Sequence, residues 1–188
     1  MIEVNALQSD IIGKLSRNLK PASEEQQANA AVAMLLRKKG QNLNVLFVKR
    51  VKNPADPWSG QIGFPGGKRE PQDKNLMQAV IRETMEETGI DLLWNCRFVG
   101  VMTVQKTKPK PDLRVLPFVV LLEYEPSIRL SQKELQKSFW IPVHQLARNR
   151  KTVKLASEKQ PACIVGGRAI WGLTYRILEE FFATIELS

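Results

Sequence analysis

The sequence predicts an α/β fold in a single globular unit, and three observations support that prediction. The chain has 188 residues, which suffices for one sizeable core. Patterns typical of helices and patterns typical of strands both occur along it. Its composition, with 43% hydrophobic and 25% charged residues, is close to the average of globular proteins. Disordered, collagenous and fibrous classes are therefore excluded.

The first part of the chain is expected to form a helix and a linker. Residues 2–19 place apolar side chains three and four positions apart, which is the spacing of an amphipathic helix. Pro21 ends this pattern, and the residues that follow it are mostly polar. We therefore divide the chain into an N-terminal helix and linker at 1–28 and one main domain at 29–188.

Strands and a shaped loop are expected next. The apolar runs at 30–36 and 44–50 predict two strands that are joined as a hairpin. Between residues 53 and 67 the chain is rich in proline and glycine, which predicts a loop of defined shape.

The clearest helix signal follows this loop. Aspartate is a residue type that caps helix starts, and glycine commonly ends helices, so Asp73 and Gly89 bracket the segment. We expect a helix from about residue 74 to residue 88, with Ile90 packing just beyond its end.

The second half of the chain combines strands with a closing helix. Residues 98–104 and 113–124 have the character of strands, joined by a basic turn at 106–111. Residues 131–138 suggest a short, polar helical piece. Residues 171–182 carry apolar side chains along one side, which predicts a helix that packs on the core.

Charge and composition limit the partners. The net charge of +9 favours polyanionic partners such as phosphorylated small molecules. The single histidine, His144, and the two distant cysteines, Cys96 and Cys163, exclude the common zinc motifs. The longest apolar run, 116–122, is far too short to span a bilayer, and we recognise no leader peptide. We therefore expect a cytoplasmic protein that does not contact a membrane.

Three glutamates form the candidate catalytic centre. Glu83, Glu86 and Glu87 have the spacing i, i+3, i+4, which puts their side chains on one face of the predicted helix. Clustered carboxylates repel one another unless a cation lies between them, and hard oxygen ligands suit Mg²⁺ or Mn²⁺. A solvated acidic helix face is the alternative interpretation of the same spacing. The nearby glycines favour the metal site, because glycine lets the backbone approach a metal or a phosphate closely.

The segment that contains these glutamates resembles the signature of the Nudix hydrolase family. That signature is Gly, five residues, Glu, seven residues, then Arg-Glu-hydrophobic-x-Glu-Glu-x-Gly-hydrophobic. Residues 82–90 match its second half, with Thr84 in place of the larger hydrophobic residue. In the first half, Asp73 follows Gly67 where the signature has Glu, and eight residues rather than seven precede Arg82.

The loop before the signature is similar to the coenzyme A pyrophosphatase branch of that family. Gly60, three residues and then Phe-Pro-Gly-Gly at 64–67 keep the pattern of that branch. Asp56 stands where the branch has an arginine, and Arg50 is separated from it by a loop one residue too long.

The resemblance implies an α/β/α sandwich around a mixed β-sheet and hydrolysis of a diphosphate bond with Mg²⁺ or Mn²⁺. It implies that Glu83, Glu86, Glu87 and the Gly67 carbonyl hold the metal, and that Arg82 orients the carboxylates. Either Glu83 or Glu134 would be the general base. The residues expected to bind substrate are Arg50, Phe64, Gly66, Lys68 and Arg69.

The expected substrate is a nucleoside diphosphate linked to another moiety. Coenzyme A or acyl-CoA, cleaved to 3′,5′-ADP and 4′-phosphopantetheine, is the first hypothesis. ADP-ribose, a dinucleotide polyphosphate and a nucleoside triphosphate are the alternatives, and a Nudix module that binds nucleotides without hydrolysis is a further one. We do not expect nucleic acid as a partner, because the basic stretches 106–114 and 148–159 contain no aromatic residue for base stacking. The chain is expected to be a monomer or a homodimer.

Overall fold

The chain folds around one large mixed β-sheet. The computed structural model describes residues 2–23, 27–155 and 158–187, with the backbone alone for residues 2–9. Within these ranges, eight strands form the large sheet and three form a second one. The large sheet is built on β1 (Ala30–Lys39), which pairs in parallel with β7 (Arg114–Leu122) and antiparallel with β2 (Asn42–Arg50). The predicted hairpin is thus confirmed.

Shorter strands extend the large sheet on both sides of this centre. Strand β2 also pairs with β3 (Ile62–Gly63) and β8 (Leu135–Pro142). Strand β7 also pairs with β5 (Cys96–Val101) and β6 (Gln105–Lys106). Strand β4 (Gly66–Lys68) pairs with the start of β1. The strand predicted at 98–104 therefore ends earlier than expected, and the chain resumes as β6. The strand predicted at 113–124 is confirmed as β7.

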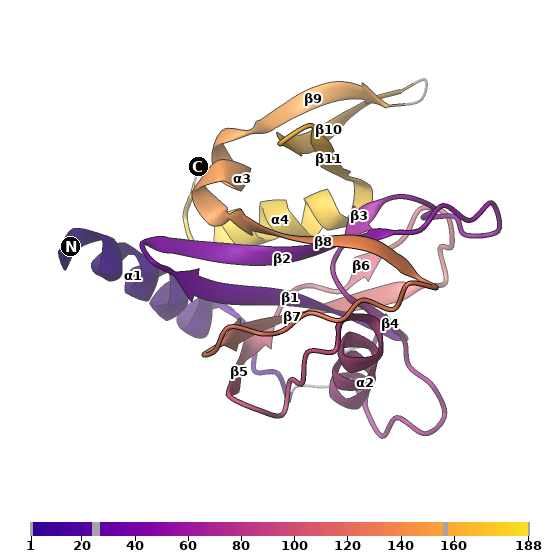
Figure 1. Cartoon of the computed structure of the whole chain (residues 1–188), viewed down its shortest axis with the longest axis horizontal. Helices are drawn as coiled ribbons and strands as arrows, with labels where there is room; N and C mark the ends of the chain where they lie inside the picture. The colour runs from indigo at the N-terminus through magenta and orange to yellow at the C-terminus, as the bar shows by residue number, and fades with distance from the viewer. Residues whose placement is uncertain (1, 24–26, 156–157, 188) are drawn as a thin grey trace.

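Helices cover both faces of the large sheet (Figure 1). Helix α2 (Leu76–Thr88) lies on one face, and α1 (Ile2–Asn18) and α4 (Gly172–Thr184) lie on the other. Each face has its own cluster of buried apolar side chains, one with contributions from α2 and the other with contributions from α1 and α4. This arrangement is the predicted α/β/α sandwich around a mixed sheet.

The N-terminal helix packs as its apolar spacing predicts. Ile11, Ile12 and Leu15 are buried in the same cluster as the closing helix α4. Residues 24–26 of the predicted linker lie outside the described part of the chain, and the division at residue 28 stays a prediction. No helix among the described residues is both long and apolar enough to cross a membrane.

A second sheet and a short helix were not predicted. They are α3 (Val143–Arg148), β9 (Arg150–Leu155), β10 (Glu158–Val165) and β11 (Arg168–Trp171). The three strands lie beyond α4, so that this helix is placed between the two sheets (Figure 1). The exposed basic side chains of β9 hide its strand character, because only one side of the strand carries apolar residues.

The helical piece expected at 131–138 is wrong. The backbone N–H groups of Glu134 and Leu135 both donate to the carbonyl of Ser131, which closes a turn, and β8 then begins at Leu135. This strand forms because it pairs along most of β2. Pairing with a distant strand overrides the local preference of a polar segment.

Helix α2 begins two residues later than predicted. Its cap is Asn75, whose side chain accepts a hydrogen bond of 2.9 Å from the backbone N–H of Gln78. Asp73, the predicted cap, is instead buried and binds Arg82. The predicted end is confirmed, because Gly89 adopts a left-handed conformation and its N–H donates to the carbonyl of Met85.

The glycine pair of β4 allows close packing on two sides. Gly66 has a φ of +141°, and a Cβ there would lie 2.2 Å from the carbonyl oxygen of Ala31 in β1. A Cβ on Gly67 would lie 2.4 Å from the carboxyl carbon of Glu83 in α2. These two glycines therefore let one short strand contact the sheet and the helix together.

The Gly66→Ala substitution tests this packing. We expect it to lower the free energy of unfolding by about 3 kcal/mol or more, because the methyl group meets the backbone of β1 and φ is strained. Gly40→Ala is the matched control, since Gly40 also has a positive φ but a Cβ there meets no atom within 4 Å. The control should cost only about 1 kcal/mol. Equal losses in urea denaturation of the two variants would contradict the predicted contact.

Candidate functional site

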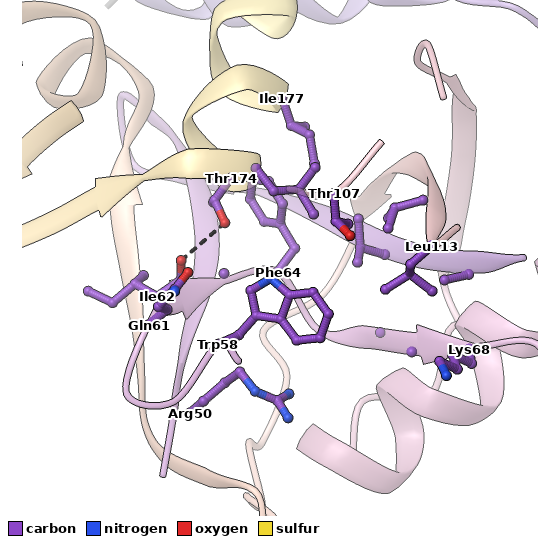
Figure 2. A pocket seen from close by; sticks show the side chains of 17 residues that line it. Arg50, Trp58, Gln61, Ile62, Phe64, Lys68, Thr107, Leu113, Thr174 and Ile177 are labelled. Carbon is purple, nitrogen blue, oxygen red and sulfur yellow. Dashed lines mark hydrogen bonds between the residues drawn. The ribbon is translucent and has the colours of Figure 1, made fainter. Parts of the chain in front are cut away.

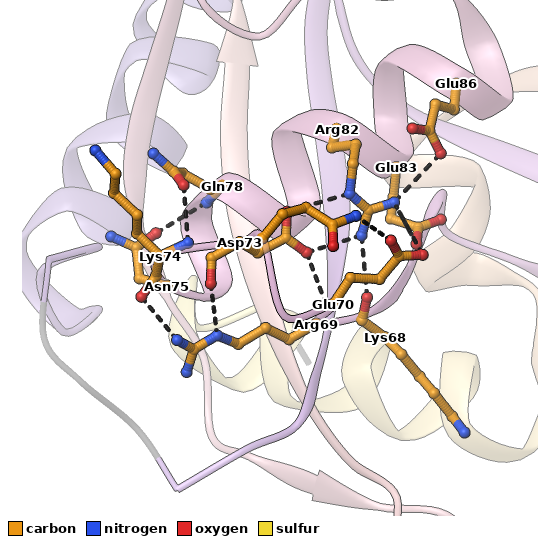
Figure 3. Close-up of polar contacts among 11 residues, drawn as sticks. Lys68, Arg69, Glu70, Asp73, Lys74, Asn75, Gln78, Arg82, Glu83 and Glu86 are labelled. Carbon is orange, nitrogen blue, oxygen red and sulfur yellow. Dashed lines mark hydrogen bonds and ion pairs between the residues drawn. The ribbon is translucent and has the colours of Figure 1, made fainter.

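The guanidinium of Arg82 is the centre of the candidate site (Figure 3). Its Nη1 donates to Glu83 Oε1 at 3.0 Å and to Glu86 Oε2 at 3.2 Å. Its Nε and Nη2 donate to the two carboxylate oxygens of Asp73 at 3.1 and 2.9 Å. Nη2 also reaches the carbonyl of Lys68 at 3.2 Å. One side chain of α2 thus connects two carboxylates of the helix with the loop that precedes it.

Asp73 is a site residue that the sequence analysis missed. It is only 4% exposed, and its Oδ2 also accepts a hydrogen bond from the backbone N–H of Glu70. The hydrogen bonds from Arg82 hold the pKa of Asp73 below its usual value, and the same pairing raises the pKa of Arg82. The signal was available in the sequence, because Asp73 stands where the family signature has glutamate.

Glu87 is the most buried of the three glutamates. Its Oε2 accepts a hydrogen bond of 2.9 Å from the backbone N–H of Gly66, and its Oε1 lies 3.9 Å from Nη1 of Arg50. Burial raises the pKa of Glu87 to about 8 against the effect of the Gly66 hydrogen bond, and the charges of Glu134 and Glu83 add to the rise. Burial also raises the pKa of Glu83, although the hydrogen bond from Arg82 opposes it.

Glu134 comes to the site from a different part of the chain. The loop before it is fixed to the end of α2, because the backbone N–H of Arg129 donates to Thr88 and that of Ser131 donates to Glu87. The carbonyl of Glu134 accepts from the N–H of Val51, next to Arg50. The charge of Glu134 consequently acts on both Glu83 and Glu87. The structure thus brings together the two residues that were predicted as alternative bases.

The donor set fits a hard divalent cation. Within the described ranges, no three acidic, histidine or cysteine side chains are already placed so that together they could hold a metal ion, so Glu83, Glu86 and Glu87 would have to turn toward it. Nevertheless, Glu83, Glu86 and Glu87 lie along one side of α2, and their carboxylates are close enough for the charge of Glu86 to raise the pKa of Glu83 and that of Glu83 to raise the pKa of Glu87. Oxygen donors that repel one another in this way are the type that Mg²⁺ and Mn²⁺ bind.

A cavity of about 250 Å³, called the first cavity below, opens beside these carboxylates (Figure 2). Gly66, Gly67 and Arg50 belong both to its wall and to the surroundings of Glu83 and Glu87. Much of the remaining wall is apolar and comes from Trp58, Phe64, Leu113, Val115, Leu173 and Ile177. The wall residues beyond β7 were not predicted, because they come from distant segments that carry no local motif.

The predicted substrate-binding residues separate into two groups. Arg50, Phe64, Gly66 and Lys68 line the first cavity. Arg69 points elsewhere, since its guanidinium donates to the carbonyls of Asp73 and Lys74 at 3.0 and 2.8 Å (Figure 3). The structure therefore gives Arg69 a place in the loop before α2 and not beside the cavity.

The loop before the glycine pair is held by an ion pair. Arg50 Nε donates to Asp56 Oδ2 at 2.7 Å, and Asp56 Oδ1 accepts from the backbone N–H of Trp58 at 3.0 Å. Burial acts to raise the pKa of Asp56, but these hydrogen bonds outweigh it and the pKa is lowered. Figure 2 shows Trp58 lying across the first cavity, with Arg50 beside it. Asp56 thus fixes a side chain that shapes the cavity.

Comparison of the sequence with known proteins identifies several relatives. The chain is 37% identical over 107 residues to an uncharacterised protein of Schizosaccharomyces pombe. The matched region covers 54% of this chain and 32% of that protein. It is 29% identical over 127 residues to the peroxisomal coenzyme A diphosphatase ndx-8 of Caenorhabditis elegans, covering 66% of this chain and 53% of that one. The mitochondrial coenzyme A diphosphatase NUDT8 of mouse is 25% identical over 142 residues, with coverages of 72% and 67%. The chain thus spans about a third and about half the length of the first two relatives.

Solved structures share the fold. The NUDIX domain of Shewanella oneidensis NrtR, complexed with ADP ribose, has a TM-score of 0.56 at 17% identity and covers 94% of this chain and 98% of its own. A NUDIX hydrolase from Alicyclobacillus acidocaldarius has a TM-score of 0.54 at 18% identity, with coverages of 85% and 93%. A family model described as the NUDIX domain matches residues 26–160. With that match, the signature along α2 and the shared fold, the chain belongs to the Nudix family, within which its relatives include coenzyme A diphosphatases.

Proposed function

We propose that the protein is a divalent-metal-dependent pyrophosphohydrolase that cleaves the diphosphate bond of a nucleoside diphosphate linked to another moiety. The observation that supports this most directly is the position of Glu83, Glu87 and Glu134. All three carboxylates lie close together beside the glycine pair and the first cavity. A module that only bound nucleotides would have no need for a repulsive cluster of this kind.

Each residue of the cluster has a proposed role. Glu83, Glu86 and Glu87 would hold Mg²⁺ or Mn²⁺, together with the carbonyl of Gly67. When bound, the ion would neutralise charge on the diphosphate oxygens. Arg82 orients two of these carboxylates through its hydrogen bonds.

The substrate would lie between the cluster and the first cavity. Arg50 and Lys68 would pair with diphosphate oxygens, because cationic side chains form their strongest hydrogen bonds with such anions. Phe64 and the backbone at Gly66 would shape the wall of the cavity beside them. Arg69 remains outside this arrangement, as its hydrogen bonds to the loop before α2 show.

Glu134 is the better candidate for the general base. Glu83 already accepts a hydrogen bond from the cationic Arg82 and would also be a metal ligand, so its carboxylate oxygens would both be engaged. Glu134 reaches the cluster from the turn before β8 and is not one of the proposed metal ligands, so its carboxylate would be free to accept the proton of the attacking water. Glu83 is the alternative base.

Coenzyme A or acyl-CoA is the proposed substrate, cleaved to 3′,5′-ADP and 4′-phosphopantetheine. Two relatives are named coenzyme A diphosphatases, which supports this choice. ADP-ribose, dinucleotide polyphosphates and nucleoside triphosphates are the alternatives. Location in the cytoplasm is also a proposal, since those relatives are named as peroxisomal and mitochondrial proteins. The monomer or homodimer, and the absence of a nucleic-acid partner, likewise stay predictions.

The first test is hydrolysis with and without the metal carboxylates. Purified protein with Mg²⁺ or Mn²⁺ should release 3′,5′-ADP from coenzyme A, measured by chromatography, and a panel of the alternative substrates would rank the leaving groups. Glu87→Gln should lower kcat/KM by at least about a hundredfold, because the metal loses a charged ligand. Glu123→Gln is the control, since this exposed glutamate pairs with Arg97. Equal and negligible rates for wild type and Glu87→Gln on every substrate would refute the proposed hydrolase.

The second test separates the base from the metal ligands. Glu134→Gln should lower kcat by about a hundredfold to ten-thousandfold and leave the Mg²⁺ concentration for half-maximal activity unchanged. Glu83→Gln should change both quantities, because Glu83 is proposed to hold the metal. If added Mg²⁺ restored the kcat of Glu134→Gln, Glu134 would be a ligand and not the base.

The third test concerns the Asp73–Arg82 pair that positions the carboxylates. Asp73→Asn should lower the free energy of unfolding by about 1.5 to 3 kcal/mol at neutral pH, because the buried Asp73 side chain loses its charge-assisted hydrogen bonds with Arg82. Since the folded-state pKa of Asp73 lies below its unfolded value, this contribution is present above about pH 4 and is lost as the pH falls through the folded-state value.

Asp10→Asn is the matched control for that measurement. Asp10 forms an exposed i, i+4 pair with Lys14 and should change stability little at any pH. Urea denaturation of the three proteins at several pH values gives the difference. A gap between wild type and Asp73→Asn that stayed constant from neutral pH to about pH 2 would contradict the assigned ion pair.

A further inference from the structure

A second cavity, of about 290 Å³, lies next to the first. It lies between the turn that follows β6, strand β10 and the start of α4. Apolar wall is supplied by Pro57, Pro109, Pro161, Trp171 and Tyr175. The unpredicted second sheet therefore contributes directly to this cavity through β10 and β11.

Four residues belong to the walls of both cavities. They are Trp58, Gln61, Thr107 and Leu173. The two spaces are thus neighbours across a shared wall and not unrelated surface hollows. Arg50, Gly67 and Lys68 are found, among the described residues, in the wall of the first cavity alone. The first cavity is therefore the one that lies next to the carboxylates, and the second lies on its other side.

The shared wall is held in position from both sides. The backbone N–H of Trp58 donates a hydrogen bond to Asp56, and Nζ of Lys110 lies over its indole ring, 5.6 Å from the ring centre. Thr107 is buried, and its hydroxyl donates to the carbonyl of Lys110 at 2.6 Å. Two loops from distant parts of the sequence are thereby held together at the point where the cavities meet.

Size and chemistry indicate what the two cavities accept together. Each alone lies below the range of about 300 to 1,000 Å³ that is typical of ligand pockets, whereas the two combined lie within it. Besides the shared Gln61, the second cavity has the side-chain amide of Gln160 in its wall. Among the described residues of this wall, the cationic ones are Lys108, which is exposed, and Arg176, whose guanidinium already donates to Gln105 and to the carbonyl of Lys106. This mixture suits an elongated, mostly apolar chain that carries amide or hydroxyl groups, and it suits a compact sugar or a second highly charged nucleotide less well.

We propose that the second cavity binds the far end of an elongated arm on the diphosphate substrate, and that the first cavity holds the part of the arm nearest the diphosphate. This inference rests on the proposed pyrophosphohydrolase activity and extends it to the selection of substrates by length. The second sheet and the start of α4 then act as a specificity element that is separate from the residues that carry out the reaction.

The experiment fills the second cavity and compares a long substrate with a short one. In Gln160→Trp, a larger side chain enters the cavity from β10. We expect kcat/KM for a medium-chain acyl-CoA to fall about tenfold, which corresponds to roughly two methylene groups that can no longer be buried. The value for ADP-ribose, whose arm is a single ribose, should not change. Lys159→Trp is the matched control, because Lys159 is the exposed neighbour of Gln160 on the same strand.

A second variant protects the test against misfolding. Lys108→Trp fills the same cavity from an exposed turn of a different loop, so it should give the same selective loss even if β10 tolerates no change. An equal fall for both substrates, no fall for either, or a wild-type enzyme that cleaves ADP-ribose but not acyl-CoA would overturn the second cavity as an arm site. A wild-type protein that cleaves no diphosphate at all would refute the proposed function itself, and this inference would fall with it.

Discussion

The ion pair between Arg82 and the buried Asp73 is the constraint on which the rest of the site depends. Arg82 lies on α2, and Asp73 lies on the loop that connects β4 to that helix, so their pairing fixes the helix against the loop. The same guanidinium then directs two carboxylates of the next turn. Asp73 is buried, so moving it away from Arg82 would leave its carboxylate without a charged partner, and this opposes movement of the loop relative to the helix. A rigid scaffold is what a cluster of mutually repelling carboxylates needs in order to stay assembled.

The glycine pair transmits this rigidity to the sheet. Gly66 lies against β1, and Gly67 lies against Glu83, so that strand, loop and helix are held at a fixed separation. The N–H of Gly66 also donates to Glu87, which satisfies one oxygen of a buried carboxylate. The position of the glutamates is therefore determined jointly by one cation, two glycines and the central strand.

The features of the fold and the site that could be predicted from the sequence are those that depend on residues close together along the chain. The spacing of the glutamates, the end of α2 at Gly89 and the hairpin of β1 and β2 depend on residues close in sequence, and the sequence predicted them. The predicted start of α2 was wrong, because the carboxylate of Asp73 accepts hydrogen bonds from Arg82 and Asn75 caps the helix instead. Glu134 was named only through the family resemblance, because its approach to α2 depends on contacts between distant segments. The cavity walls beyond β7 and the second sheet also depend on such contacts, for which the sequence has no local signal.

Asp56 shows how one departure from a family pattern changes the chemistry of a site. The related branch has an arginine at this position, which would add positive charge beside the substrate. Here the carboxylate engages Arg50 and the backbone of Trp58, so the loop contributes an ion pair and an aromatic wall in place of a second cation. Because Arg50 is paired with Asp56, part of its charge is already balanced inside the protein. In the proposed reaction, discrimination between substrates would then depend less on phosphate charge and more on the shape of the two cavities, which share Trp58 as part of their walls.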